Sequence, residues 1–138
     1  MGQWVPMKKT YTVLVVDDNE AQGYATGRVL KNAGYSVLHA QTGATGLSIA
    51  CETSPDVVLL DINLPDVNGV SVAHQLRTRP ETRKASIVLY SATSSPSEGL
   101  DERAREAGAF LTVPFEPDHL LHVVKGALAR AGKTRENP

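Results

Sequence analysis

The sequence predicts an α/β doubly wound fold, in which helices cover both faces of a parallel β-sheet. Two patterns favour this class. Short apolar runs recur without clean alternation with polar residues, which is typical of strands buried on both faces. Segments with helical periodicity separate these runs, as expected when strands and helices alternate along the chain. The 138 residues, 41% hydrophobic and 21% charged, are enough for one domain with an ordinary core.

Five apolar runs are the expected strands, because each consists mainly of β-branched or aliphatic residues. In chain order they are VLVV (13–16), VLHA (37–40), VVLL (57–60), IVLY (87–90) and FLTV (110–113).

The expected helices follow these runs. The first ends before Gly34, which is a plausible helix stop. The fourth is highly charged with a thin apolar stripe, and the last opens with Pro117, a residue favoured at a first helical position. The spacing of apolar residues predicts helices at 20–32, 43–52, 70–78, 97–107 and 117–131.

Composition excludes several functional classes. The formal net charge is −1, from 14 basic and 15 acidic residues, so no electrostatic footprint for nucleic acid exists. No run approaches the roughly 18 apolar residues of a membrane span. The single cysteine, Cys51, rules out a disulfide framework and favours a reducing cytoplasm. We expect one domain at 11–131 with flexible tails at 1–10 and 132–138.

Acidic residues follow two of the predicted strands. Asp17 and Asp18 end the first run and Asp61 ends the third, while Ser91 follows the fourth. In open α/β sheets, ligands bind beyond the carboxyl ends of the strands. Clustered carboxylates repel one another and need a counter-charge, and an oxygen-rich cluster suits Mg²⁺. One carboxylate can then act as a nucleophile towards phosphorus.

The alternative interpretation is that these residues are turn residues and helix caps, which Asp and Asn favour. That explanation suffices for any single aspartate. It is weaker for Asp17, Asp18 and Asp61 together, because each follows a buried strand.

Four ordered segments carry a family resemblance. VLVVDDNEA, DVVLLDINLPDVNG, YSAT and LTVPF resemble the signature segments of the response-regulator receiver domain of two-component signalling, in the CheY-like superfamily. The resemblance extends from about Thr12 to Leu128. It implies a flavodoxin-like (βα)5 fold with a five-stranded parallel sheet in the order 2-1-3-4-5.

The resemblance also implies a Mg²⁺-dependent phosphoacceptor site. Asp61 would take a phosphoryl group from a histidine kinase or a histidine phosphotransfer protein. Asp18 would bind Mg²⁺ directly and Asp17 largely through water, with Asp61 and the backbone carbonyl of Asn63 completing the protein ligands. The domain would not be an enzyme beyond its own phosphorylation and dephosphorylation.

Further residues match positions that read or tune the phosphoryl group in this family. Ser91 would donate a hydrogen bond to a phosphoryl oxygen, and Phe110 is the aromatic residue whose rotamer would follow. Asn63 and Thr93 would modulate hydrolysis, while Pro65 and Gly69 would shape the loop after Asp61. A downstream partner or output domain would read the resulting surface.

One position departs from the family pattern. The family places a lysine immediately before the proline of LTVPF, where this chain has Val113. A valine neither donates a hydrogen bond nor neutralises charge. We therefore expect steeper dependence on Mg²⁺ and weaker coupling between the phosphoryl group and the pair Ser91 and Phe110.

Two other functions compete with a working receiver. A pseudo-receiver would keep the fold as a phosphorylation-independent interaction module, and Val113 is its support. A hydrolase with an aspartyl nucleophile usually carries a second aspartate two residues later, where this chain has Asn63. Nucleotide binding is disfavoured because acidic residues follow the first strand and no G-x-x-x-x-G-K-[ST] motif exists.

Overall fold

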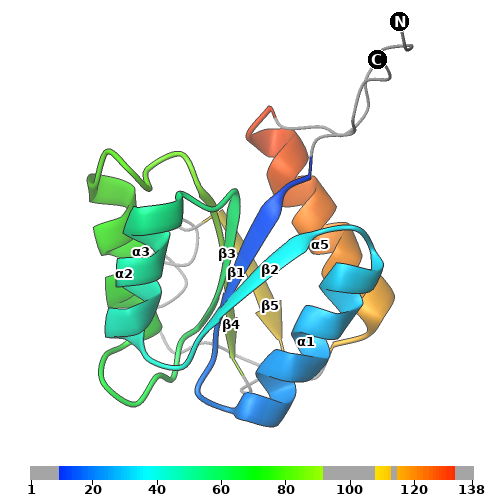
Figure 1. Ribbon diagram of the computed structural model, residues 1–138, viewed down its shortest axis with the longest axis horizontal. Helices are drawn as coiled ribbons and strands as arrows, with labels where there is room; N and C mark the ends of the chain where they lie inside the picture. The colour runs from blue at the N-terminus through cyan, green and yellow to red at the C-terminus, as the bar shows by residue number, and fades with distance from the viewer. Residues whose placement is uncertain (1–9, 92–107, 113–114, 133–138) are drawn as a thin grey trace, which may run out of the picture.

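The fold is a five-stranded parallel sheet with helices on both faces (Figure 1). The computed structural model describes residues 10–91, 108–112 and 115–132. The strand order is β2-β1-β3-β4-β5, which confirms the expected flavodoxin-like topology. The strands are β1 (Thr12–Val16), β2 (Ser36–Ala40), β3 (Val57–Asp61), β4 (Ser86–Ser91) and β5 (Gly108–Thr112).

The described helices form one layer on each side of the sheet. In Figure 1, α1 and α5 lie on one side of the sheet, and α2 and α3 lie on the other. Their bounds are α1 (Glu20–Asn32), α2 (Gly43–Thr53), α3 (Gly69–Thr78) and α5 (Pro117–Arg130).

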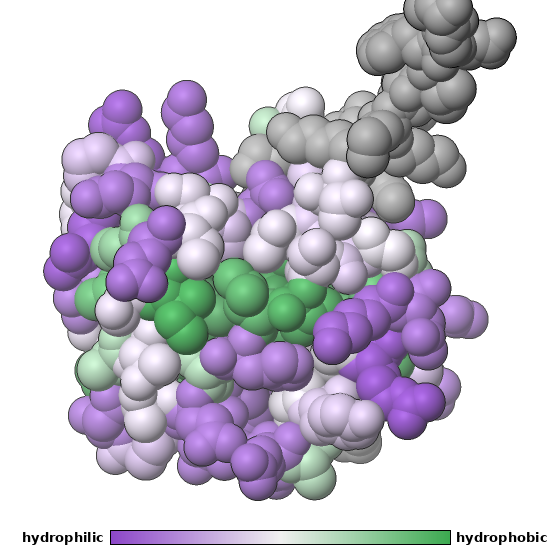
Figure 2. All heavy atoms as spheres, in the orientation of Figure 1, coloured by the Kyte–Doolittle hydropathy of each residue, from purple (hydrophilic) through white to green (hydrophobic). Residues whose placement is uncertain are grey.

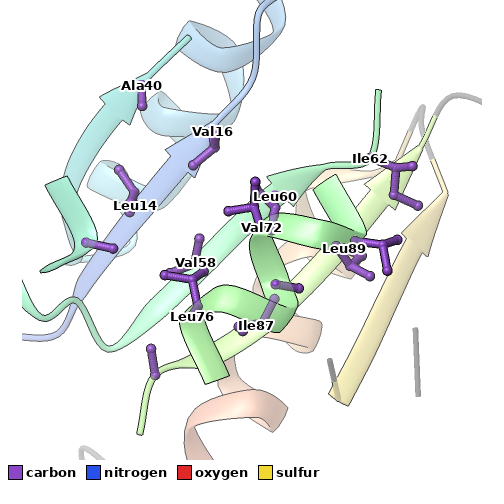
Figure 3. Close-up of a cluster of buried hydrophobic side chains, with 14 residues drawn as sticks. Leu14, Val16, Ala40, Val58, Leu60, Ile62, Val72, Leu76, Ile87 and Leu89 are labelled. Carbon is purple, nitrogen blue, oxygen red and sulfur yellow. The ribbon is translucent and has the colours of Figure 1, made fainter. Parts of the chain in front are cut away.

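Alternating strand residues build two cores. On the α2 and α3 side, the buried cluster includes Leu14 on β1 and, beside α3, Leu60 and Leu89 (Figure 3). On the α1 and α5 side, the cluster includes Val15 and Tyr90. Because both faces of β1, β3 and β4 are buried, their sequences are continuous apolar runs rather than alternating patterns.

The first helix begins and ends with local signals. The Asn19 side chain accepts a hydrogen bond from the Gln22 N–H at 3.0 Å, which caps the helix start. At the other end, Gly34 has φ = 101°, a conformation that glycine adopts without steric cost. The predicted stop at Gly34 is therefore confirmed.

One predicted element differs in its bounds, and others lie outside the described residues. The fifth strand begins two residues earlier than predicted, at Gly108, and is described to Thr112. The predicted helix at 97–107 lies outside the described residues. So do residues 1–9 and 133–138, which make up most of the two expected tails.

The sheet edge formed by β2 is less buried than the centre. Val37 and Leu38 are only half-buried there, and a band of apolar side chains crosses the face of the molecule shown in Figure 2. Among the described residues, no helix is long and apolar enough to cross a membrane.

Candidate metal centre

The parallel register brings the predicted acidic residues together. Val16 pairs with Leu60, so the next residues on the two adjacent strands, Asp17 and Asp61, lie side by side. Asp18 completes the group, and one carboxylate oxygen from each of the three lies within 4.8 Å of the others. The group lies at the carboxyl end of the sheet, where β1 leads into α1 at the bottom of Figure 1.

Asp17 is the buried member and is held by three donors. Only 3% of the residue is exposed. The Asn19 backbone N–H donates to Oδ1 at 2.9 Å, and Gln22 Nε2 donates to Oδ2 at 3.0 Å. The Tyr90 hydroxyl also donates to Oδ2, at 2.5 Å. A buried carboxylate held by three donors has a defined orientation, and the hydrogen bonds offset the cost of burying it.

Asp61 is half-buried and has an unusual affinity for protons. Partial burial raises the pKa of its carboxyl from 3.8 to about 6, and the negative charges of Asp17 and Asp18 add to the rise. The hydrogen bond from the Asn63 N–H to Asp61 Oδ1, at 2.9 Å, opposes it. Among the described residues, the charges that act on Asp61 are those of Asp17 and Asp18, both negative. The three carboxylates together therefore favour binding of a cation.

The loop after β3 is held against the neighbouring strand and helix. The Ile62 N–H donates to the Tyr90 carbonyl at 2.9 Å, and the Gly69 N–H donates to the Ile62 carbonyl at 2.8 Å. A Cβ at position 69 would lie 2.3 Å from the Asp61 carbonyl oxygen. Only glycine therefore permits α3 to begin this close to the Asp61 backbone.

Asp66 ties the same loop to α2. Its carboxylate accepts hydrogen bonds from the Gly43 N–H at 2.9 Å and from the Ala44 N–H at 3.0 Å, both in the first turn of α2. These two bonds lower the pKa of the exposed Asp66 carboxyl. The loop that carries Asn63 and Pro65 is therefore fixed at both ends and in its middle.

The structure describes the remaining predicted residues to different extents. Ser91 is buried at the end of β4, one residue beyond the pairing of Asp61 with Tyr90. Phe110 lies in β5, where the structure describes the backbone and not its side chain. Thr93 and Val113 lie outside the described residues. Asn63 is exposed and positions Asp61 through its N–H.

These residues fit Mg²⁺. The ion prefers oxygen ligands and binds through one or two carboxylates while keeping several waters. Asp18 and Asp61 present accessible carboxylates, while the buried Asp17 has most of its acceptor capacity engaged by protein donors.

Three contributors to the site do not follow from the sequence patterns. The sequence patterns place Tyr90 at the end of an apolar run, Gln22 in a helix and Asp66 in a loop, and predict no contact with the site for any of them. Tyr90 offered one signal: a tyrosine in a buried strand needs a hydrogen-bond partner for its hydroxyl, and acidic groups end the nearby strands.

Comparison with known proteins identifies the class. The profile of the response regulator receiver domain matches residues 13–125. The chain therefore belongs to this family, whose members act in two-component signalling as phosphoacceptors with an acidic Mg²⁺-binding pocket. Members typically have histidine kinases and downstream effectors as partners.

The chain covers almost the whole length of individual relatives. The chain is similar to the protein PilH of Pseudomonas aeruginosa, with 30% identity over 117 residues, 85% of this chain and 97% of PilH. It is similar to the polar-differentiation response regulator DivK of Brucella ovis, with 29% identity over 88% of this chain and 99% of DivK. A CheY-like receiver domain protein from Methanospirillum hungatei has a similar structure, with TM-score 0.81, 25% identity and coverage of 90% and 98%.

Proposed function

We propose that this receiver domain accepts a phosphoryl group on Asp61 in a Mg²⁺-dependent reaction and thereby changes a partner-binding surface. The observation that carries the proposal is the placement of the half-buried Asp61 beside Asp17 and Asp18, at the carboxyl end of the sheet. The donor would be the phosphohistidine of a histidine kinase or of a histidine phosphotransfer protein.

Asp61 acts as the nucleophile. One of its carboxylate oxygens attacks the phosphorus, a P–O bond forms as the P–N bond to histidine breaks, and an acyl phosphate results. The Asn63 N–H holds Asp61 Oδ1 at 2.9 Å and so leaves Oδ2 for the attack. A near-fixed nucleophile matters because phosphoryl transfer depends mainly on positioning and electrostatic stabilisation.

Mg²⁺ supplies neutralisation of the charge shared by the carboxylates and the incoming phosphoryl oxygens. Asp18 and Asp61 would bind it directly, Asp17 largely through water, and the Asn63 carbonyl would complete the protein ligands. Three donors already engage Asp17, which supports its outer position.

Four residues are proposed to read or tune the phosphoryl group. Ser91 ends β4 beside β3 and would donate its hydroxyl to a phosphoryl oxygen. Phe110, on the neighbouring strand β5, would change rotamer as Ser91 moves. Asn63 and Thr93 would set the rate of hydrolysis.

Val113 sets the atypical feature of this proposal. Where the family resemblance predicts lysine, valine provides neither positive charge nor a donor. We propose that phosphorylation is retained, with steeper dependence on Mg²⁺, and that coupling to Ser91 and Phe110 is weakened.

The test is intact mass after incubation with acetyl phosphate, with and without Mg²⁺. The parent is expected to gain one phosphoryl group only with Mg²⁺, and Asp61→Asn is expected to gain none. Val113→Lys is expected to lower the Mg²⁺ concentration needed. Loss of uptake in the parent together with uptake in Val113→Lys would mean that the valine silences the site.

Val113 also favours a second candidate, a pseudo-receiver that binds partners without phosphorylation. It predicts no uptake by the parent or by Val113→Lys, whether acetyl phosphate or a histidine kinase is the donor. Uptake that needs both Asp61 and Mg²⁺ would exclude this candidate.

A further inference from the structure

Tyr90 is the one described donor to Asp17 that comes from a distant part of the chain. Asn19 and Gln22 belong to the loop and the first helical turn that follow Asp17 itself. Tyr90 lies on β4, which β3 separates from β1 in the sheet. Its hydroxyl therefore connects the acidic group to a strand that contributes no carboxylate to it.

The ring of Tyr90 is fixed by its surroundings. Only 2% of the residue is exposed, and it belongs to the core on the α1 and α5 side of the sheet. It packs edge to face against Phe115, with ring centroids 6.3 Å apart and an interplanar angle of 88°. Because the ring cannot turn away without opening this core, the hydroxyl is held in place before any cation binds.

The three donors distribute unequally over the Asp17 carboxylate. Oδ2 receives both the Tyr90 hydroxyl and Gln22 Nε2, whereas Oδ1 receives only the Asn19 N–H. Each carboxylate oxygen has two acceptor positions. Oδ2 is therefore saturated, and Oδ1 keeps one position for a metal-bound water.

The hydrogen bond from Tyr90 to Asp17 lies in a strongly negative environment. Asp17 is buried in a group of three carboxylates, and the described charges acting on its neighbour Asp61 are all negative. A neutral hydroxyl stabilises a buried carboxylate by a hydrogen bond, and it adds no positive charge that would repel a cation.

We propose that Tyr90 is a positioning residue of the metal centre: its hydroxyl holds Asp17 Oδ2, which orients Oδ1 towards the cation. Tyr90 thus supplies the acidic group with a direct hydrogen-bond donor from β4. The proposal rests on the Mg²⁺ site of the proposed function. Outer partners of direct metal ligands typically contribute 10- to 100-fold to metal affinity; because Asp17 would reach the cation largely through water, the lower end, about tenfold, is expected here.

The experiment compares Tyr90→Phe with Tyr35→Phe in the full chain, by calorimetric titration with Mg²⁺. Tyr35 is a matched control, because it is buried in the same core but lies before β2, at the opposite end of the sheet. Tyr90→Phe is expected to bind Mg²⁺ about tenfold more weakly, and Tyr35→Phe as well as the parent. Phosphoryl uptake by Tyr90→Phe should reach the parent level at saturating Mg²⁺, which a general folding defect would not permit.

A spectroscopic readout and a double mutant locate the effect. The parent and Tyr35→Phe should show a Mg²⁺-induced change in near-UV tyrosine circular dichroism that Tyr90→Phe lacks. On an Asp17→Asn background, adding Tyr90→Phe should change Mg²⁺ affinity by less than about twofold, because Tyr90 acts through that carboxylate. A full additional loss there would overturn the proposal.

The outcomes separate this proposal from the proposed function. If the parent binds Mg²⁺ and takes up phosphoryl while Tyr90→Phe matches its affinity, only the role of Tyr90 is wrong. An equal loss in Tyr35→Phe would likewise overturn it. If the parent binds no Mg²⁺, both the role of Tyr90 and the proposed function are wrong. If Tyr90→Phe does not fold, the parent and Tyr35→Phe decide the question: absence of any Mg²⁺-induced change in their near-UV tyrosine circular dichroism would overturn the proposal.

Discussion

Replacing Asp61 by asparagine is expected to stabilise the fold when Mg²⁺ is absent. Asparagine has the same shape and keeps an oxygen to accept the Asn63 N–H. It removes the charge that Asp61 places beside Asp17 and Asp18. The substitution therefore isolates the free-energy cost of that charge, which comes first from partial burial and then from the neighbouring carboxylates, and it should do so without opening a cavity.

The magnitude follows from the pKa of Asp61. The pKa of this carboxyl is raised from 3.8 to about 6 in the folded protein. At about 1.4 kcal/mol per pKa unit, the gain in stability on removing the charge is at most about 3 kcal/mol. Asp61 is only half-buried, so solvent and salt screen part of this free energy. We expect the free energy of unfolding of Asp61→Asn to exceed that of the parent by about 1–2 kcal/mol near pH 7.

The pH dependence has a definite sign. Between about pH 4 and pH 6 the folded parent binds more protons at Asp61 than the unfolded chain does, so parent stability falls as pH rises through this window. The favourable contribution of protonated Asp61 is complete below the lower value and lost above the upper one. The advantage of Asp61→Asn should therefore vanish near pH 4 and be complete near pH 7.

Urea denaturation followed by circular dichroism, with a chelator present, measures this difference. Asp66→Asn is the matched control of opposite sign: its pKa is lowered by the hydrogen bonds from Gly43 and Ala44, so the loss of that carboxylate should destabilise the fold near neutral pH, and this loss should fade as pH falls through the lowered pKa. Added Mg²⁺ should stabilise the parent more than Asp61→Asn. The reasoning is refuted if Asp61→Asn is no more stable than the parent near pH 7, or if its advantage persists unchanged to pH 4.

Three further substitutions test other parts of the structure. Gly69→Ala places a Cβ 2.3 Å from the Asp61 carbonyl oxygen, so a loss of about 2 kcal/mol or more in urea denaturation is expected, together with weaker Mg²⁺ binding; Gly126→Ala, which meets only a flexible arginine end, should be neutral or stabilising. Asn19→Ala removes the cap of α1 and should cost about 1 kcal/mol, and thermal denaturation would contradict this if the melting temperature were unchanged. Leu60→Ala empties a fully buried position and should cost about 2–5 kcal/mol; a smaller loss by urea denaturation would mean that the core collapses into the space.

Much of the candidate site was predictable because the residue that follows each strand is given directly by the sequence. An aspartate directly follows each of the runs VLVV and VVLL, and the carboxyl ends of parallel strands lie at one edge of a sheet. Once Val16 pairs with Leu60, no further information is needed to place Asp17 beside Asp61. The periodicity of the chain and the stop at Gly34 likewise depend on near neighbours in the sequence.

Tertiary structure decided the contacts that depend on sheet order and side-chain reach. The Tyr90 hydroxyl reaches Asp17 from β4, with β3 between their strands, and Asp66 reaches the first turn of α2. These partners are 73 and 23 residues apart, and no periodicity relates such positions. The raised pKa of Asp61 is also a product of assembly, because burial and the charges of Asp17 and Asp18 act on it only after the strands align. The sequence by itself determined which side chains follow the strands. Packing determined which of these side chains are buried, which accept hydrogen bonds from distant residues and which have a shifted pKa, because those properties depend on distances through space.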